Sequence, residues 1–401
     1  MIEIEGESNS ATPKLRILQV AHKFPPFMGG IEMHTFEVGR RMAAMGHSVT
    51  VLTGDPTGTL AKEEEVSGVQ VLRVPVYPKS SDVFFAPAVY GKLLRADVDA
   101  VHIQGFHTFV PPLAMLGAIR SSTAFVATFH SGGHSSPLRK FVRGTQMAML
   151  RPLLVRADRL IAVSEFEADH FANGLRVPRG LISVVSNGAE IEAAPEVARP
   201  DIDNPVIVSV GRLERYKGHQ RVISAFGEVS KLRPNAKLQV IGEGPYKPKL
   251  QELARRLGLA DRVAIGGIPP ERRKQMGTTL ASASVIVLLS EYEAHPVAAL
   301  EAISLGCSVI ATNSTGFAEM AKSGLLRGID PQASPKAIAA AIVEEIDGSP
   351  DRKRTIKIAN WDDCTRNLLD IYFEVVRARR QTADGRPSPR SVYASRPTYG
   401  V

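Results

Sequence analysis

The stretch SEYEAHPVAALE, which spans Ser290–Glu301, places two carboxylates on either side of a junction between an apolar segment and a helix. The segment just before it, VIVLL at 285–289, is β-branched and aliphatic and predicts a buried parallel strand. Pro296 suits a first helical turn, and good helix formers follow it. The free N–H groups and positive dipole end of that turn would face the space above the strand. Glu293 and Glu301 therefore flank a helix start that would attract an anion or a ring of hydroxyls.

Each glutamate alone also fits a structural role. Glu301 would then only complement the helix dipole, and Glu293 would be a solvated loop residue. The rest of the chain has to decide between these interpretations.

Length and composition indicate a soluble protein of two domains. A chain of 401 residues is too long for one ordinary core, and 44% hydrophobic with 22% charged residues is typical of globular proteins. The sequence contains no run of eighteen apolar residues, and its start lacks the basic and apolar segments of a signal peptide. We therefore expect a cytoplasmic protein.

The charge of the chain favours acidic partners. A net charge of +8 fits sugar nucleotides, anionic lipid or nucleic acid. Nucleic acid is disfavoured, because the sequence shows neither zinc-finger spacing nor basic residues interleaved with aromatic ones. Cys307 and Cys364 are the only cysteines, which excludes a disulfide scaffold and a thiolate metal cage. Composition leaves the oligomeric state unknown.

Apolar strands alternate with helical stretches in both halves of the sequence. This pattern predicts two Rossmann-like, doubly wound α/β domains in series, with the carboxyl ends of both sheets facing a central cleft. The expected organisation is a disordered tail at 1–13, an N-terminal acceptor-side domain at 14–190, a linker at 191–204, a C-terminal nucleotide-sugar-binding domain at 205–360, a helix at 361–380 that packs back on the N-terminal domain, and a disordered tail at 381–401.

Two glycine-containing loops follow predicted strands. The loop GRLERYKG at Gly211–Gly218 holds Arg212 and Lys217 above a helix start, where they would neutralise a diphosphate. A solvated cationic loop is the alternative. Gly29 and Gly30 follow the first strand and either let the backbone approach a ligand or form an ordinary turn. Neither loop has the Gly-x-Gly-x-x-Gly pattern, so NAD binding is disfavoured.

Histidines follow two other predicted strands. His130 would reach the cleft and hydrogen-bond a sugar hydroxyl or a phosphate oxygen. Together with His102 and His107 it matches no common ligand spacing, so we expect no metal.

A basic stretch begins at Pro137 and includes Arg139, Lys140 and Arg143, with apolar residues between the charges. It would lie on an anionic membrane surface or form the solvated face of a helix. The first alternative would place the protein peripherally on the inner face of the plasma membrane.

Several segments, in this order and spacing, together resemble the retaining glycosyltransferases of family 4, which have two Rossmann-like domains in the GT-B arrangement. The resemblance runs from about Arg16 to Val376. It is carried by the segments Pro25–Glu32, Thr128–His130, Val184–Gly188, Gly211–Gly218, Val240–Pro245, Glu293–Glu301 and Thr315–Glu319.

The resemblance implies which residues hold the donor phosphates. Gly29 and Gly30 match the loop that approaches them, and Arg212 and Lys217 match the pair that stabilises the departing diphosphate.

The resemblance also implies roles at the sugar. Glu293 matches the carboxylate that orients the transferred sugar, Glu301 the one that holds the nucleotide ribose, and His130 a histidine near the reaction centre. Further donor contacts are expected from the same segments, at Gly211, His295 and Val297.

One departure from the family concerns the donor. Ala294-His295-Pro296 stands where the family usually has Gly-Phe-Gly, and Pro296 has no N–H to offer a sugar hydroxyl. The identity of the donor sugar is therefore left open.

The resemblance implies transfer of a hexose from a UDP- or GDP-sugar to an acceptor hydroxyl, with retention, without metal or cofactor, in polysaccharide or glycolipid synthesis. The acceptor would be a sugar, a lipid-linked sugar or a small molecule. A sugar-nucleotide epimerase and a non-catalytic sugar-nucleotide-binding protein are the alternatives.

Overall fold

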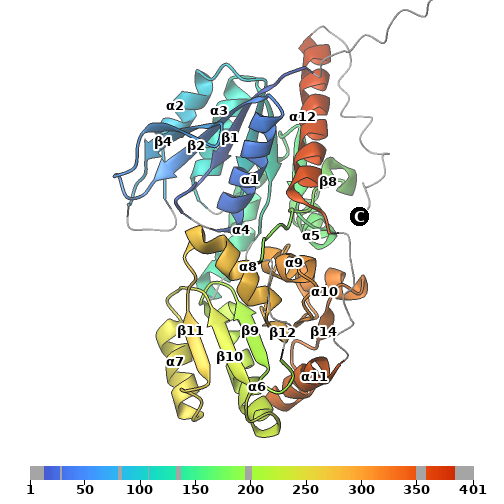
Figure 1. The fold of residues 1–401 in the computed structure, drawn as a ribbon. Coiled ribbons are helices and arrows are strands. Elements are labelled where there is room, and N and C mark those ends of the chain that lie inside the picture. The colour runs from blue at the N-terminus through green and yellow to red at the C-terminus, as the bar shows by residue number, and fades with distance from the viewer. Residues whose placement is uncertain are drawn as a thin grey trace, which may run out of the picture.

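A computed structural model of the chain describes residues 13–27, 29–79, 84–106, 108–131, 137–194, 201–348 and 358–383, without the side chains of residues 137–145, 270, 382 and 383. Within these ranges two α/β units follow one another, each built around one sheet. Figure 1 shows the N-terminal unit above the C-terminal unit. The predicted fold class of two doubly wound units is confirmed.

The N-terminal sheet has eight strands in the order β3-β4-β2-β1-β5-β6-β7-β8. These are β1 Arg16–Ala21, β2 Ser48–Asp55, β3 Glu63–Val66, β4 Val69–Pro75, β5 Ala100–Gln104, β6 Ala124–Thr128, β7 Arg159–Ala162 and β8 Ile182–Val184. The helices are α1 Gly30–Ala44, α2 Ala88–Leu94, α3 Val110–Arg120, α4 Pro137–Leu154 and α5 Glu165–Leu175. The strand order reverses between β1 and β5, and this reversal places a ligand crevice at their carboxyl ends.

One strand of this sheet was not predicted and is not parallel. β3 pairs with β4 in an antiparallel hairpin, whereas the other strands pair in parallel. The two residues between them, Ser67 and Gly68, both have positive φ, at 52° and 81°. This backbone conformation matches the tight turn that right-twisted hairpins prefer.

The C-terminal sheet has six parallel strands in the order β11-β10-β9-β12-β13-β14. These are β9 Val206–Val210, β10 Lys237–Ile241, β11 Val263–Gly266, β12 Val285–Leu288, β13 Val309–Thr312 and β14 Arg327–Ile329. The helices are α6 His219–Leu232, α7 Lys247–Arg256, α8 Arg273–Ala281, α9 Val297–Ser304, α10 Thr315–Lys322 and α11 Pro335–Asp347. Here the order reverses between β9 and β12, the strands that precede the Arg/Lys loop and Glu293.

Both sheets are covered on both faces. Every residue of β5, β6, β12 and β13 is buried, which explains why these strands are continuous apolar runs rather than alternating ones. In each unit one apolar cluster lies on either side of the sheet.

The C-terminal helix α12, Trp361–Ala383, packs on the N-terminal unit, beside α1 in Figure 1. Its residues Leu368, Tyr372 and Val375 share an apolar cluster with Val38 and Met42 of α1. The helix ends three residues beyond the predicted end at 380, and the rest of the predicted tail lies outside the described residues.

The chain passes between the units twice, and the two crossings lie side by side. The backbone N–H of Ala189 donates to the carbonyl of Ala359 at 3.1 Å. A Cβ on Gly188 would lie 2.3 Å from the backbone nitrogen of Trp361, so this contact requires glycine. The units are thus joined by two adjacent strands of chain.

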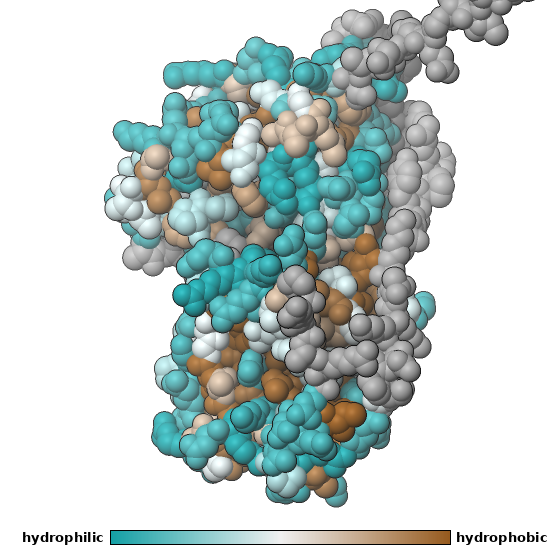
Figure 2. Space-filling view, in the orientation of Figure 1, coloured by the Kyte–Doolittle hydropathy of each residue, from teal (hydrophilic) through white to brown (hydrophobic). Residues whose placement is uncertain are grey.

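Hydrophilic residues predominate on the face drawn in Figure 2, and hydrophobic residues appear in smaller groups on both units. Within the described ranges, no helix combines the length and apolar character needed to cross a bilayer.

Candidate functional site

The loop after β9 carries the predicted cations and is fixed by a glycine at its end. Gly218 has φ of 76°, and a Cβ there would lie 1.9 Å from the carbonyl oxygen of Leu289 at the end of β12. The loop therefore packs directly on the neighbouring strand, and Gly218 becomes the residue from which α6 begins. Its free N–H groups and dipole face the same end of the sheet.

This packing brings Lys217 to Glu293. The Lys217 ammonium lies 2.5 Å from Glu293 Oε1, and both side chains are 17% exposed. Burial opposes the lysine charge, but Glu293 outweighs burial, so the pKa of Lys217 is raised above its ordinary value of 10.5. The structure thus joins two predicted catalytic residues in one half-buried ion pair.

Arg212 lies in the same loop but faces outward. Its side chain is 65% exposed, and its guanidinium lies 2.8 Å from Glu214. It also acts on the N-terminal unit: burial raises the pKa of Glu32 in α1, and Lys23 and Arg212 partly oppose that rise. Arg212 is therefore close to the predicted Gly29–Gly30 loop while remaining free to move.

The loop that carries Glu293 is held by the start of α10. The backbone N–H of Glu293 donates to Thr315 Oγ1 at 3.1 Å, and its carbonyl accepts from Gly316 at 2.8 Å. A Cβ on Gly316 would lie 2.3 Å from the carbonyl oxygen of Ala294, so glycine permits this approach. Helix α9 then begins at Val297, as predicted.

Glu301 is buried in α9 and pairs with Arg273 at the start of α8. Burial raises the pKa of Glu301, and Arg273 opposes this effect without cancelling it. Arg273 was not predicted, because nothing distinguishes it from the neighbouring cations in ERRK at 271–274.

On the N-terminal unit, Gly29 and Gly30 precede α1 and differ in their surroundings. A Cβ on Gly29 would lie 2.4 Å from Glu32 Oε2, so the Glu32 carboxylate lies over this glycine. Gly30 has no heavy atom within 4 Å of such a Cβ. Gly30 thus leaves open space at the helix start.

His130 follows β6 in a left-handed conformation with φ of 46°. Its Nε2 lies 2.8 Å from Gln104 Oε1. Since that oxygen only accepts, His130 carries its proton on Nε2, and Nδ1 is the acceptor. The ring also contacts His34 edge to face, with centroids 4.6 Å apart.

His34 was missed by sequence reasoning, because a histidine inside α1 carries no signal of its own. Burial lowers its pKa to about 4, and Asn187 Oδ1 lies 2.9 Å from its Nδ1. Burial together with His34 also lowers the pKa of His295 to about 4. In the described part of the chain, His295 Nδ1 is buried without a hydrogen-bond partner. Neutral imidazoles from both units therefore meet near His130.

The predicted basic residues Arg139, Lys140 and Arg143 lie on α4, but their side chains fall outside those that the structure describes. Arg151 of the same helix donates to the carbonyl of Leu175 at 2.6 Å and so serves the fold.

Among the described residues, no group of three or more His, Cys, Asp or Glu side chains has the arrangement of a metal site. His107 lies outside them.

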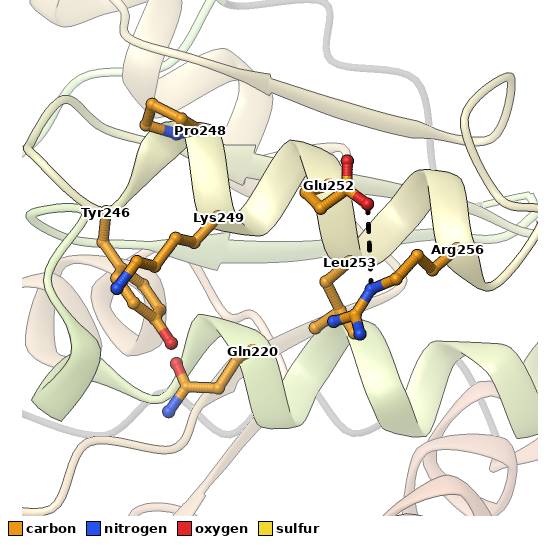
Figure 3. Close-up of a pocket in the computed structure, with 7 residues that line it drawn as sticks. All are labelled: Gln220, Tyr246, Pro248, Lys249, Glu252, Leu253 and Arg256. Carbon is orange, nitrogen blue, oxygen red and sulfur yellow. Dashed lines mark ion pairs between the residues drawn. The ribbon is translucent and has the colours of Figure 1, made fainter.

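A separate pocket of about 340 Å³ lies between α6 and α7. Figure 3 shows Tyr246 and Lys249 at one end and Arg256 beside Glu252 at the other. The residues that line it are Gln220, Tyr246, Pro248, Lys249, Glu252, Leu253 and Arg256. They include none of the predicted site residues, so this pocket is distinct from the predicted site.

Two family models match consecutive parts of the chain. The model described as Glycosyltransferase Family 4 matches residues 28–193, and that described as Glycosyl transferases group 1 matches residues 190–361. Among curated proteins, the chain is 27% identical over 386 residues to a phosphatidylinositol N-acetylglucosaminyltransferase protein of Arabidopsis thaliana, covering 92% of this chain and 84% of that protein.

Solved structures share the fold. Sucrose-phosphate synthase from Thermosynechococcus elongatus matches with a TM-score of 0.73 and 18% identity, covering 91% of this chain and 100% of that one. Anabaena HepE in complex with UDP-glucose matches with a TM-score of 0.66 and 20% identity, covering 92% and 99%. At these identities the structures show the fold alone, which is the GT-B arrangement of two facing units.

Proposed function

Because this chain belongs to the GT-B glycosyltransferases of family 4, group 1 type, we propose that it transfers a hexose from a nucleoside-diphosphate sugar to an acceptor hydroxyl with retention of anomeric configuration. The observation that carries this proposal is the Lys217–Glu293 pair, 2.5 Å apart at the carboxyl ends of β9 and β12. These are the two strands at which the sheet order reverses, where doubly wound sheets bind their ligands.

Three charged groups are available for the donor. Lys217 and Arg212 lie at the start of α6 and would neutralise the diphosphate together with the helix dipole. Glu301 would accept hydrogen bonds from the ribose hydroxyls once Arg273 moves aside, which the 40% exposure of the Arg273 side chain allows.

The proposed reaction exchanges one bond at the anomeric carbon for another. The bond from this carbon to the diphosphate oxygen breaks, and a bond to the acceptor oxygen forms on the same face. The acceptor proton passes to the departing diphosphate. Lys217 stabilises the charge that develops on the diphosphate, and Glu293, released from Lys217, orients the sugar hydroxyls. His130 Nδ1 accepts a hydrogen bond from a sugar hydroxyl on the opposite side.

UDP and GDP both remain in the proposal for the base of the donor. The fold relative HepE was solved with UDP-glucose, which supports UDP as the first donor to test. The Arabidopsis relative is named for a phosphatidylinositol acceptor, which supports a lipid-bound acceptor.

An aromatic surface on the N-terminal unit also supports a lipid-bound acceptor. Tyr77, Phe85 and Phe109 are 57%, 42% and 57% exposed. Tyr77 and Phe85 form a backbone bridge, and Phe109 donates its N–H to the carbonyl of Phe84 at 3.2 Å, so the three are neighbours. Exposed aromatic rings suit the boundary between lipid headgroups and water. We propose that the protein works peripherally on the inner face of the plasma membrane.

The test starts with a thermal-shift panel of UDP- and GDP-sugars, since only a ligand that binds the folded state raises the melting temperature. The stabilising donor is then incubated with and without acceptors, and the anomeric configuration of the product is read by NMR. Retained configuration in a transferred sugar supports the proposal. An isomerised donor without any acceptor would identify an epimerase instead, and nucleotide binding without transfer or donor hydrolysis would identify a non-catalytic protein.

A further inference from the structure

Tyr292 lies between β12 and Glu293 and reaches across to the N-terminal unit. Its hydroxyl lies 2.7 Å from Ser131 Oγ, and its ring contacts Phe166 of α5 edge to face, with centroids 5.8 Å apart. Ser131 directly follows His130 in the chain, as Glu293 directly follows Tyr292. One hydrogen bond therefore joins the immediate neighbours of two predicted catalytic residues.

The direction of this hydrogen bond follows from Glu167. The Glu167 carboxylate is fully buried, and its Oε1 accepts from both the backbone N–H of Ser131, at 2.6 Å, and Ser131 Oγ, at 2.5 Å. Its Oε2 accepts from the backbone N–H of Val163 at 2.8 Å. Since the single hydroxyl proton of Ser131 goes to Glu167, the Tyr292 hydroxyl must donate to Ser131 Oγ.

Ser131 is thus a fixed acceptor. Its backbone N–H and its hydroxyl are both held by one carboxylate inside the N-terminal unit. Tyr292 therefore adjusts to the N-terminal unit, and not the reverse.

A second contact follows the same path between the units. The backbone N–H of Phe166 donates to Glu319 Oε2 of α10 at 3.4 Å. The covalent connections are two adjacent crossings near Gly188 and Trp361, which leave rotation about that point available. The contacts of Tyr292 and Phe166 are made between the facing loops, where they limit such rotation.

We propose that Tyr292 is a positioning residue whose hydrogen bond to Ser131 sets Glu293 against His130 across the two units. Consecutive Cα atoms are about 3.8 Å apart, so fixing Tyr292 and Ser131 leaves their neighbours little freedom. The proposal rests on the proposed function for the roles of Glu293 and His130, but the hydrogen bond and its effect on the two units do not depend on that function.

The sharpest variant is Tyr292→Phe, because it removes the hydroxyl and keeps the ring against Phe166. The net effect of one hydrogen bond corresponds to a factor of about 3–10, so we expect kcat to fall about 3–10-fold. The KM for the donor stays near the wild-type value, because Tyr292 itself contacts no donor. Ser131→Ala produces the same loss, and the double variant loses no more than either single one. Tyr77→Phe, at an exposed tyrosine, is the matched control and keeps wild-type kinetics.

A structural readout is independent of activity. Spin labels at Asp97 and Arg255, which are 86% and 66% exposed and lie one in each unit, report the distance between the units. Tyr292→Phe is expected to broaden that distance distribution, and Tyr77→Phe is expected to leave it unchanged.

The outcomes separate the two proposals. Unchanged kcat and an unchanged distance distribution in Tyr292→Phe would overturn the positioning role, as would fully additive losses in the double variant. Failure of the wild type to transfer sugar from any donor would overturn the proposed function, and the spin-label distances would still decide whether Tyr292 ties the units together.

Discussion

Replacing Lys217 by methionine removes the ammonium that lies 2.5 Å from Glu293 and keeps a side chain of similar length. In the ligand-free protein this breaks a charge-assisted hydrogen bond between two side chains that are 17% exposed. Hydrogen bonds to charged groups contribute about 1.5–3 kcal/mol, and water can reach part of the released carboxylate. We therefore expect the free energy of unfolding to fall by about 1–2 kcal/mol.

The effect on catalysis is larger than the effect on stability. One electrostatic stabiliser of a transition state contributes about 10²–10³-fold in kcat, or about 3–4 kcal/mol. Lys217→Met is accordingly expected to lower kcat by about 10²–10³-fold. Because the pKa of Lys217 is raised, its stabilisation is fully present below its ordinary value of 10.5 and is lost only as the pH rises through the folded-state value. The stability difference between wild type and variant should therefore be constant from about pH 6 to 9 and shrink above about pH 10.5.

The assays are steady-state transfer from the donor found in the thermal-shift panel and urea denaturation across this pH range. Lys231→Met is the matched control, because Lys231 also pairs with a glutamate, Glu228 at 2.7 Å, but is 68% exposed on α6. Exposed pairs contribute about 0–1 kcal/mol, so the control should keep the wild-type rate. A wild-type kcat in Lys217→Met would remove this residue from the mechanism and refute the reasoning from the ion pair.

Four further outcomes follow. Arg212→Ala should also lower kcat by about 10²–10³-fold, with almost no loss of stability because the side chain is 65% exposed; wild-type rates would remove Arg212 from the mechanism. Glu301→Gln should weaken donor binding by about 10–100-fold in calorimetry. Since burial raises the pKa of Glu301 despite Arg273, the carboxylate reduces stability at neutral pH, so the variant should be at least as stable at pH 7, with the difference shrinking as the pH falls through that raised value; a large destabilisation at pH 7 would contradict this. Gly218→Ala should lower the free energy of unfolding by at least about 2 kcal/mol, because its Cβ would lie 1.9 Å from the Leu289 carbonyl; unchanged denaturation would show that the loop yields. Transfer should continue in excess chelator, because Arg212 and Lys217 supply the charge for the diphosphate, and its complete loss would contradict a metal-independent mechanism.

The sequence predicts the sheets well where strands are buried on both faces. β12 and β13 are uninterrupted apolar runs, and their predicted positions agree with the structure to within one residue. The antiparallel strand β3 escaped prediction because EEEV at Glu63–Val66 is mostly exposed and has no apolar run. Its only signal was the pair Ser67-Gly68, whose positive φ angles form the hairpin.

The site residues were predictable one at a time, and their contacts were not. Arg212, Lys217, Glu293 and His130 each follow a strand end, which the local pattern reveals. Lys217 and Glu293, however, are 76 positions apart in the chain, and Tyr292 and Ser131 are 161 apart. Spacing over such lengths carries no local signal, because only the strand order brings these loops together.

The ligand-free site already gives each charge expected to bind the donor a protein partner. Lys217 pairs with Glu293, Arg212 with Glu214, and Glu301 with Arg273. Binding therefore exchanges partners, and each exchange returns only the difference between the old contact and the new one. A free phosphate would take up only the lysine and the arginine, and a free nucleoside would take up only Glu301. A nucleoside diphosphate engages all three charges at once, so these ion pairs favour it over its fragments by making every partial exchange leave a half-buried charge unpaired.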